Sequence, residues 1–210
     1  VQMALALQRH ATSKVTSLAE LEQVGSFGFR GEALAAISSV CEVRLTSRTA
    51  EANHAKRLIS HPGSLASDSA PAGAPRGTTV ECIDLFAATP ARRKFLKAPP
   101  TEAAYCLEAV RKIALAAPGV GFRIHVDGRP WRHWPATATR PDTDEGPAAS
   151  EAEARVSDVI GEAIEWMTVD ESAGPMRIRG FLGVPDAARG RGDRQYWFVN
   201  GRAIRDRMLG

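Results

Sequence analysis

The chain has 210 residues, of which 27 are Lys or Arg and 24 are Asp or Glu, and its formal net charge is +3. With 44% hydrophobic and 24% charged residues it has an ordinary globular composition and enough length for one large or two small domains. It contains no apolar run of membrane-spanning length and no secretory signal pattern, which predicts a cytoplasmic protein without a membrane partner. The mild net charge decides nothing about nucleic acid.

The three cysteines, Cys41, Cys82 and Cys106, lie far apart and form no Cys-x-x-Cys motif. This spacing predicts neither a disulfide framework nor a zinc site. We interpret all three as small buried apolar residues.

The chain begins inside an apolar pattern without an initiator Met, which predicts the end of a helix in a piece of a longer protein. A short polar run at 10–14 follows. Ser17 and Glu20 then form a capping box, which predicts a short helix at 17–24.

A glycine-rich loop at 25–31 is the feature around which the chain is organised. Gly25, Gly28 and Gly31 lie three apart, and helix formers follow, which predicts a helix at 32–40. Backbone N–H groups at such a junction lack intrahelical partners, and the helix dipole is positive there, so phosphate fits. Arg30 adds donors that match phosphate oxygens. The alternative is a plain glycine-rich turn, and the loop is not a P-loop because no Gly-Lys-Ser/Thr follows.

Alternating apolar residues predict strands at 41–48, 56–60 and 77–85. Between the second and third of these strands, the segment 62–75 is rich in Ser, Ala, Gly and Pro and is predicted to be a loop.

A second helix is predicted to start where Thr89 precedes Pro90, an N-cap residue before a first-turn proline. This helix carries four basic residues: Arg92, Arg93, Lys94 and Lys97. Two interpretations stay open, a solvated face or a patch that contacts phosphate.

Amphipathic spacing predicts a long helix at 101–117, and an Asp-Gly turn between 122–126 and 131–134 predicts a hairpin. The polar segment 137–150 is the predicted linker between two domains.

The remaining block is predicted to contain one helix and two strands, at 152–160, 176–184 and 195–200. Asn200-Gly201 is a second hairpin turn signal.

Three motifs in this order closely resemble the MutL family of DNA mismatch repair ATPases: His10-Ala11-Thr12-Ser13-Lys14, Gly28-Phe29-Arg30-Gly31-Glu32-Ala33-Leu34 and Thr89-Pro90-Ala91-Arg92-Arg93-Lys94-Phe95-Leu96. The resemblance runs from about Leu5 to the C-terminus and is weakest at 51–75 and 137–153. One departure is Ala88, where the family usually has asparagine.

The resemblance implies an α+β protein. It places a GHKL-type ATPase α/β sandwich, truncated at its N-terminus, at 1–136. The start of a ribosomal-protein-like βαβ second domain follows the linker, at 151–210.

The resemblance also implies that ATP and Mg²⁺ are the cofactors. The implied ATP-binding residues are Thr12, Ser13, Lys14, Gly28, Phe29, Arg30, Gly31, Glu32, Ala33, Leu34, Thr78 and Thr79. The family's catalytic glutamate, magnesium-binding asparagine and adenine-gripping Asp-x-Gly-x-Gly loop have no counterpart in this chain. We therefore expect an ATPase family member with no catalytic or metal-binding residue of its own, unable to hydrolyse ATP alone.

For the intact protein, the resemblance implies an ATP switch that dimerises, binds DNA with little sequence preference and couples mismatch recognition to strand incision. The implied DNA-binding residues are Arg92, Arg93, Lys97, Arg202, Arg205 and Arg207. The implied partners are a second copy, MutS and, in some bacteria, the MutH nickase and a helicase. Two alternatives stay open: a non-enzymatic nucleic-acid-binding module, or another GHKL ATPase such as a gyrase subunit.

Overall fold

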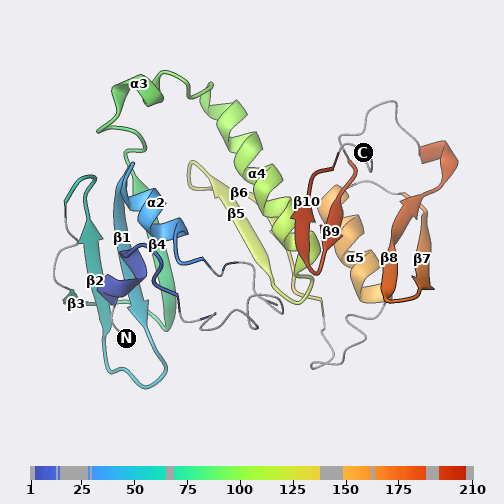
Figure 1. Cartoon of the computed structure of the whole chain (residues 1–210), viewed down its shortest axis with the longest axis horizontal. Helices are drawn as coiled ribbons and strands as arrows, with labels where there is room; N and C mark the ends of the chain where they lie inside the picture. The colour runs from blue at the N-terminus through green and yellow to red at the C-terminus, as the bar shows by residue number, and fades with distance from the viewer. Residues whose placement is uncertain are drawn as a thin grey trace. The chain divides into compact units, whose positions relative to one another are not determined.

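The computed structural model describes residues 3–12, 14, 28, 30–64, 69–137, 149–161, 164–187 and 194–206. The chain divides into two compact units, Val1–Lys97 and Ala98–Gly210 (Figure 1). The helix predicted at 17–24 lies outside the described residues. Among the described helices, none combines the length and the apolar character needed to cross a bilayer.

The first unit is built on a four-stranded antiparallel sheet in the order β3-β2-β1-β4. Three of its strands confirm the predictions: β1 Glu42–Arg48, β2 Ala55–Ser60 and β4 Gly77–Ile83. The short β3 Ala70–Ala72 lies within the segment predicted to be a loop. Its Pro71 has no N–H to donate, and an edge strand is the position where that loss is tolerated.

Two helical segments lie over this sheet, η1 Met3–Leu7 and α2 Ala33–Ser38 (Figure 1). The helix is shorter than the predicted 32–40. The Ser39 hydroxyl donates to the Ala36 carbonyl at 2.7 Å, a local bond that competes with continuation of the helix.

The core of the first unit lies between η1 and the sheet. Met3, Leu45 and Leu58 are buried against one another, and Leu7 packs on them. On the opposite face of β1, Thr46 is also buried, and its hydroxyl accepts a 3.0 Å hydrogen bond from Nε of Arg57. Both faces of the central strand are therefore covered.

The second unit contains the long helix α4 Pro99–Ala116, the hairpin of β5 Phe122–Val126 and β6 Arg129–Trp134, and α5 Ala149–Ile160. The predicted helices and hairpin are confirmed. The buried residues of this core are Leu107, Ala114, Trp134 and Val159. The Phe122 and Trp134 rings meet edge to face, with centroids 6.4 Å apart.

Arg155, a fully buried arginine, joins α5 to the hairpin. Its Nη2 donates to the carbonyl oxygens of Pro118, Val120 and Pro135, each at 2.7 Å. Its guanidinium carbon lies 5.6 Å from the centroid of the Phe122 ring. One side chain thus links the turn after α4, the end of β6 and the helix α5.

Burial lowers the pKa of Arg155, and the nearby Asp158 carboxylate partly opposes that shift. An arginine remains charged at neutral pH even so. The linker predicted at 137–150 lies mostly outside the described residues, so the domain boundary stays a prediction. Nevertheless, α5, which follows it, packs on α4 and β6 within one compact unit.

The rest of the second unit, as far as the structure describes it, consists of two hairpins and a short 3-10 segment. Their bounds are β7 Trp166–Ala173, β8 Met176–Gly183, η2 Pro185–Ala187, β9 Trp197–Val199 and β10 Arg202–Ile204. The sequence analysis missed β7 because Asp170, Glu171 and Ser172 interrupt its apolar pattern. Arg177 of β8 donates to both carboxylate oxygens of Asp170, each at 2.7 Å, and this hydrogen bonding lowers the pKa of Asp170.

Both predicted hairpin turns have the backbone that their sequences require. Asp127 and Gly128 have φ angles of 50° and 74°, and Asn200 and Gly201 have 48° and 75°. Two successive positive φ angles are typical of type I′ turns.

We predict that Arg155→Met lowers the free energy of unfolding by about 3 kcal/mol, because three backbone carbonyls each lose a 2.7 Å hydrogen bond from the guanidinium. The matched control is Arg123→Met on the exposed side of β5, which should stay within about 0.5 kcal/mol of the parent. Urea unfolding followed by tryptophan fluorescence measures both, since Trp134 lies in the same core. Equal unfolding midpoints for the two variants would contradict the role given to Arg155.

Candidate functional site

The glycine loop leads directly into α2. Of the predicted phosphate-binding residues, Gly28, Arg30, Gly31, Glu32, Ala33 and Leu34 are described, whereas Phe29 lies outside the described residues. Glu32 occupies the N-cap position without a side-chain cap hydrogen bond, and its carbonyl accepts the first helical bond from Ala36 at 2.8 Å. The N–H groups of the first helical turn therefore remain available to an anion. Because α2 has only six residues, its dipole adds little.

Gly31 has a backbone that another residue would strain. Its φ angle is +64°, and a Cβ on it would lie 2.5 Å from the carbonyl oxygen of Ala11. Both the left-handed conformation and the close approach require glycine. Gly28, by contrast, has no atom of the described residues within 4 Å of the position that a Cβ would take.

The close approach at Gly31 brings the segment 10–14 to the glycine loop. Nδ1 of His10 lies 3.4 Å from Oε1 of Glu32, and His10 itself has a φ of 63°. Both side chains are more than half exposed. The two motifs that are separate in the sequence thus lie next to each other in the fold.

Thr12 and Lys14 lie in this segment, and Ser13 lies outside the described residues. The Thr12 hydroxyl accepts a 3.1 Å hydrogen bond from the Lys14 backbone N–H, a local turn contact. The Lys14 side chain is exposed. This contact uses only an oxygen lone pair, so the Thr12 hydroxyl hydrogen can still be donated to a phosphate oxygen.

Thr78 and Thr79 lie at the start of β4, an edge strand of the described sheet. The Thr78 hydroxyl is 2.9 Å from the Ser47 hydroxyl on β1, and Thr79 pairs with Thr46. Both threonines are exposed. Their assignment to the adenine end of a nucleotide rests on the family resemblance and stays a prediction.

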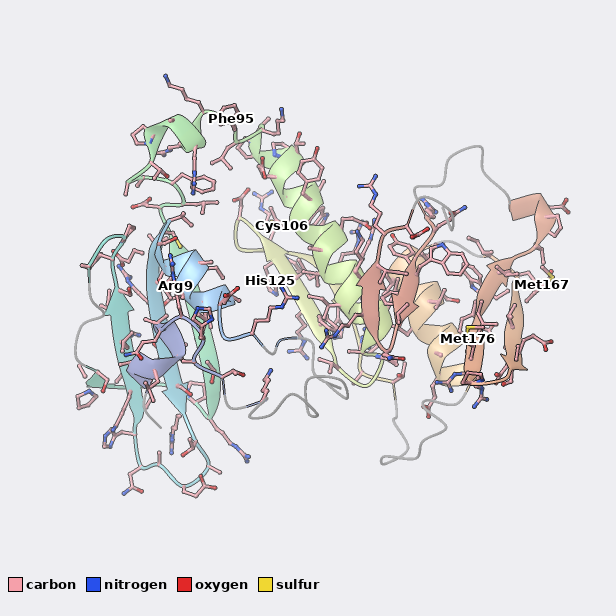
Figure 2. All side chains as sticks on the ribbon, viewed as in Figure 1. Arg9, Phe95, Cys106, His125, Met167 and Met176 are labelled. Atoms are coloured by element: carbon pink, nitrogen blue, oxygen red, sulfur yellow. The ribbon has the colours of Figure 1, made fainter. Side chains whose placement is uncertain are left out.

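The basic segment that follows β4 forms only one helical turn, α3 Pro90–Arg93. After it, Phe95 and Leu96 donate to carbonyls three residues back, so the helix tightens and ends sooner than predicted. Arg92, Arg93 and Lys97 are exposed, as is Phe95, at 80% (Figure 2).

Thr89 begins this turn through its backbone. Its carbonyl accepts from the N–H groups of Arg92 and Arg93, at 2.9 and 3.1 Å. Thr89 is the N-cap residue, as predicted, but its hydroxyl is buried and makes no hydrogen bond within the described part of the chain. Upstream of this turn, the Phe86 N–H donates to the carbonyl of Val40, two residues after the end of α2, at 2.8 Å.

The other predicted DNA-binding residues belong to the second unit. Arg202 is half-buried at the start of β10, opposite Val199. Arg205 is exposed just beyond this strand, and Arg207 lies outside the described residues. The structure thus places the predicted DNA-binding residues in two separate units.

Sequence reasoning missed the contacts that His10 makes with Glu32 and Ala11 makes with Gly31. His10 and Ala11 stand in the polar run, but no spacing signal joins that run to Gly31, because their contact is tertiary. Nowhere in the described ranges do three His, Cys, Asp or Glu side chains gather as metal ligands would.

Comparison with known proteins gives consistent matches along the chain. The family model described as DNA mismatch repair protein, C-terminal domain, matches residues 156–210. The DNA mismatch repair protein MutL of Ralstonia nicotianae is 46% identical over 99% of this chain, which covers 30% of that protein. The MutL of Thiobacillus denitrificans is 47% identical over 99% of this chain, which covers 33% of that protein. The chain therefore spans about a third of the length of these relatives.

A solved structure confirms the predicted fold class. The Aquifex aeolicus MutL ATPase domain, complexed with ADP, matches with a TM-score of 0.65 and 28% identity, over 93% of this chain and 69% of that one. The α+β architecture is thus that of a GHKL-type ATPase domain. By sequence over nearly its whole length and by fold, the chain belongs to the MutL family of DNA mismatch repair proteins.

Proposed function

We propose that this chain is the nucleotide-sensing part of a mismatch repair switch, which binds ATP at the glycine loop. The observation that carries this proposal is the contact of Gly31 with the backbone of Ala11, which joins the loop to the segment that would cover a nucleotide. The neighbouring Aquifex aeolicus structure, described as complexed with ADP, supports the proposal.

The described residues have the chemistry to hold phosphate groups. The first N–H groups of α2 and the Arg30 guanidinium supply donors, and Lys14 supplies an ammonium charge. We further assign Ser13 and Phe29 to the phosphate end, and Thr78 and Thr79 to the adenine end. When bound, ATP with Mg²⁺ supplies the phosphate charge and the bond that hydrolysis breaks.

Hydrolysis needs groups that this chain does not supply. In this family a glutamate positions water and an asparagine holds magnesium, and no motif in the chain matches the segment that carries them. We infer that the chain binds nucleotide as part of an ATPase whose catalytic groups come from upstream residues.

For the intact protein, we propose that nucleotide orders the 10–14 segment and promotes dimerisation around DNA in the cytoplasm. Arg92, Arg93 and Lys97, together with Arg202, Arg205 and Arg207, would contact phosphates of the DNA backbone. The dimer would pass the signal from MutS to strand incision, through the MutH nickase and a helicase in bacteria that have them.

A second candidate function is nucleic-acid binding without enzymatic activity. The observation that favours it is the basic turn around α3, where four exposed Lys and Arg residues occur between Phe86 and Lys97 without an acidic residue. Another GHKL ATPase is no longer an alternative, since the chain belongs to the MutL family.

Gly31→Ala should weaken binding of a non-hydrolysable ATP analogue at least about tenfold, because alanine strains the positive φ and its Cβ displaces Ala11. The matched control is Gly73→Ala, which lies outside the implied ATP-binding residues and whose added methyl group meets no atom of the described residues. Calorimetric titration with magnesium should be made on this chain and on a form extended at its N-terminus to match the relatives. Equal affinities for the two alanine variants would remove Gly31 from the site.

The chain alone should release no phosphate from ATP above the rate of a blank, whereas the N-terminally extended form should turn over. The physical reason is the missing base and the missing metal ligand. A steady-state phosphate-release assay compares the two forms at equal concentration. Turnover by the 210-residue chain itself would show that its own residues supply the catalytic groups.

Reversing charge with Arg92→Glu and Arg93→Glu together should weaken DNA binding and reduce the slope of log affinity against log salt by about 2. The control is Arg123→Glu with Arg129→Glu, an equal charge change on the β5–β6 hairpin. Fluorescence anisotropy on a labelled duplex at several salt concentrations gives both slopes. If the α3 pair and the hairpin pair change the slope equally, α3 is no specific contact and net charge explains the binding.

A further inference from the structure

Two of the three cysteines lie on neighbouring strands of the first unit. Cys41 is fully buried directly before β1, and Cys82 is exposed on β4. Cys106, on α4 of the second unit, is also exposed. The prediction that all three are buried is therefore wrong for Cys82 and Cys106, because Cys82 lies on an edge strand and Cys106 on the outer side of its helix.

The strand register brings Cys41 and Cys82 to the same face of the sheet. Cys82 pairs with Val43, and Cys41 comes two residues before Val43. Side chains two residues apart along a strand point to the same face. The two thiols are thus diagonal neighbours at the end of the sheet where α2 joins β1.

Contacts around Cys41 hold it against β4. Its Sγ donates to the Ile37 carbonyl at 3.3 Å, and the Cys82 thiol and the Ile83 backbone lie near enough to influence its pKa. The 2.8 Å bond from the Phe86 N–H to the Val40 carbonyl ties the same two chain segments together. The two sulfur atoms are therefore close without being bonded.

The two cysteines have different reactivities. Burial and the neighbouring Cys82 raise the pKa of the Cys41 thiol, so Cys41 stays protonated and shielded from solvent. Cys82 is open to solvent, and accessible thiolates are the ones that oxidants attack first.

We propose that Cys82 is an oxidation site for peroxides and that Cys41 resolves the oxidised thiol to an intramolecular disulfide. In the first step, the Cys82 thiolate attacks one oxygen of hydrogen peroxide, which forms a sulfenic acid and releases water after proton transfer. In the second step, the Cys41 sulfur attacks the Cys82 sulfur, and the sulfenic hydroxyl leaves as a second water with the Cys41 proton. Two thiols lose two electrons in total, and the peroxide gains them.

The disulfide would join the start of β1 to β4, beside the C-terminal end of α2. It would restrict the helix whose first turn follows the glycine loop. This inference concerns cysteine chemistry alone, so it stands or falls independently of nucleotide binding.

The test uses a Cys106→Ser form of this chain, so that Cys41 and Cys82 are its only thiols. After peroxide treatment and blocking of free thiols, mass spectrometry should find a peptide pair linked through Cys41 and Cys82. Its mass should be two hydrogen atoms less than the sum of the two free peptides. A dithiol should reverse the link. In the same form, dimedone, which traps sulfenic acids, should label little Cys82.

The matched control adds Cys41→Ser to the same chain. Without a resolving thiol, Cys82 should stop at the sulfenic acid and be labelled by dimedone in most molecules. Equal dimedone labelling of Cys82 with and without Cys41 would overturn the proposal, as would links between chains in place of the internal link. The linked peptide is sought in the Cys106→Ser form, which keeps the buried Cys41. Its absence there would count against the proposal even if the Cys41→Ser form misfolded.

Discussion

Burial of the apolar face of β1 is the constraint on which the first unit depends. Val43 and Leu45 point to this face, and β1 pairs with strands on both sides. Met3 of η1 packs on Leu45, and α2 lies beside η1 and contacts β1. The two segments that form the candidate phosphate site are therefore placed by the packing of apolar residues that never touch a ligand.

The candidate site depends on the absence of a side chain at Gly31. At Gly31 the absence of a Cβ lets the backbone of Ala11 approach, and the positive φ turns the chain into α2. The polar contacts around it are weak by comparison, since His10 and Glu32 are largely exposed and exposed ion pairs contribute at most about 1 kcal/mol. Steric fit rather than charge therefore holds Gly31 and Ala11 together.

Local patterns in the sequence predicted most strands, both hairpin turns and the start of α3, because alternation, Asp-Gly, Asn-Gly and Thr-Pro act within a few residues. They missed β7, where Asp170 replaces apolar alternation and pairs with Arg177 across the hairpin. The glycine loop was identified from its spacing, but the approach of Ala11 to Gly31 is tertiary. The family resemblance, not local pattern, named Thr78 and Thr79, whose role stays a prediction.

The three hydrogen bonds of Arg155 also bear on where this fold can be divided. The family model begins at residue 156, one position after the arginine, whereas the carbonyls that Arg155 binds lie between residues 118 and 135. A gene fusion or an exchange of segments between relatives that follows the sequence border would part the guanidinium from its acceptors. A division of this fold that keeps Arg155 with its acceptors must therefore lie at another position than the start of the matched family model.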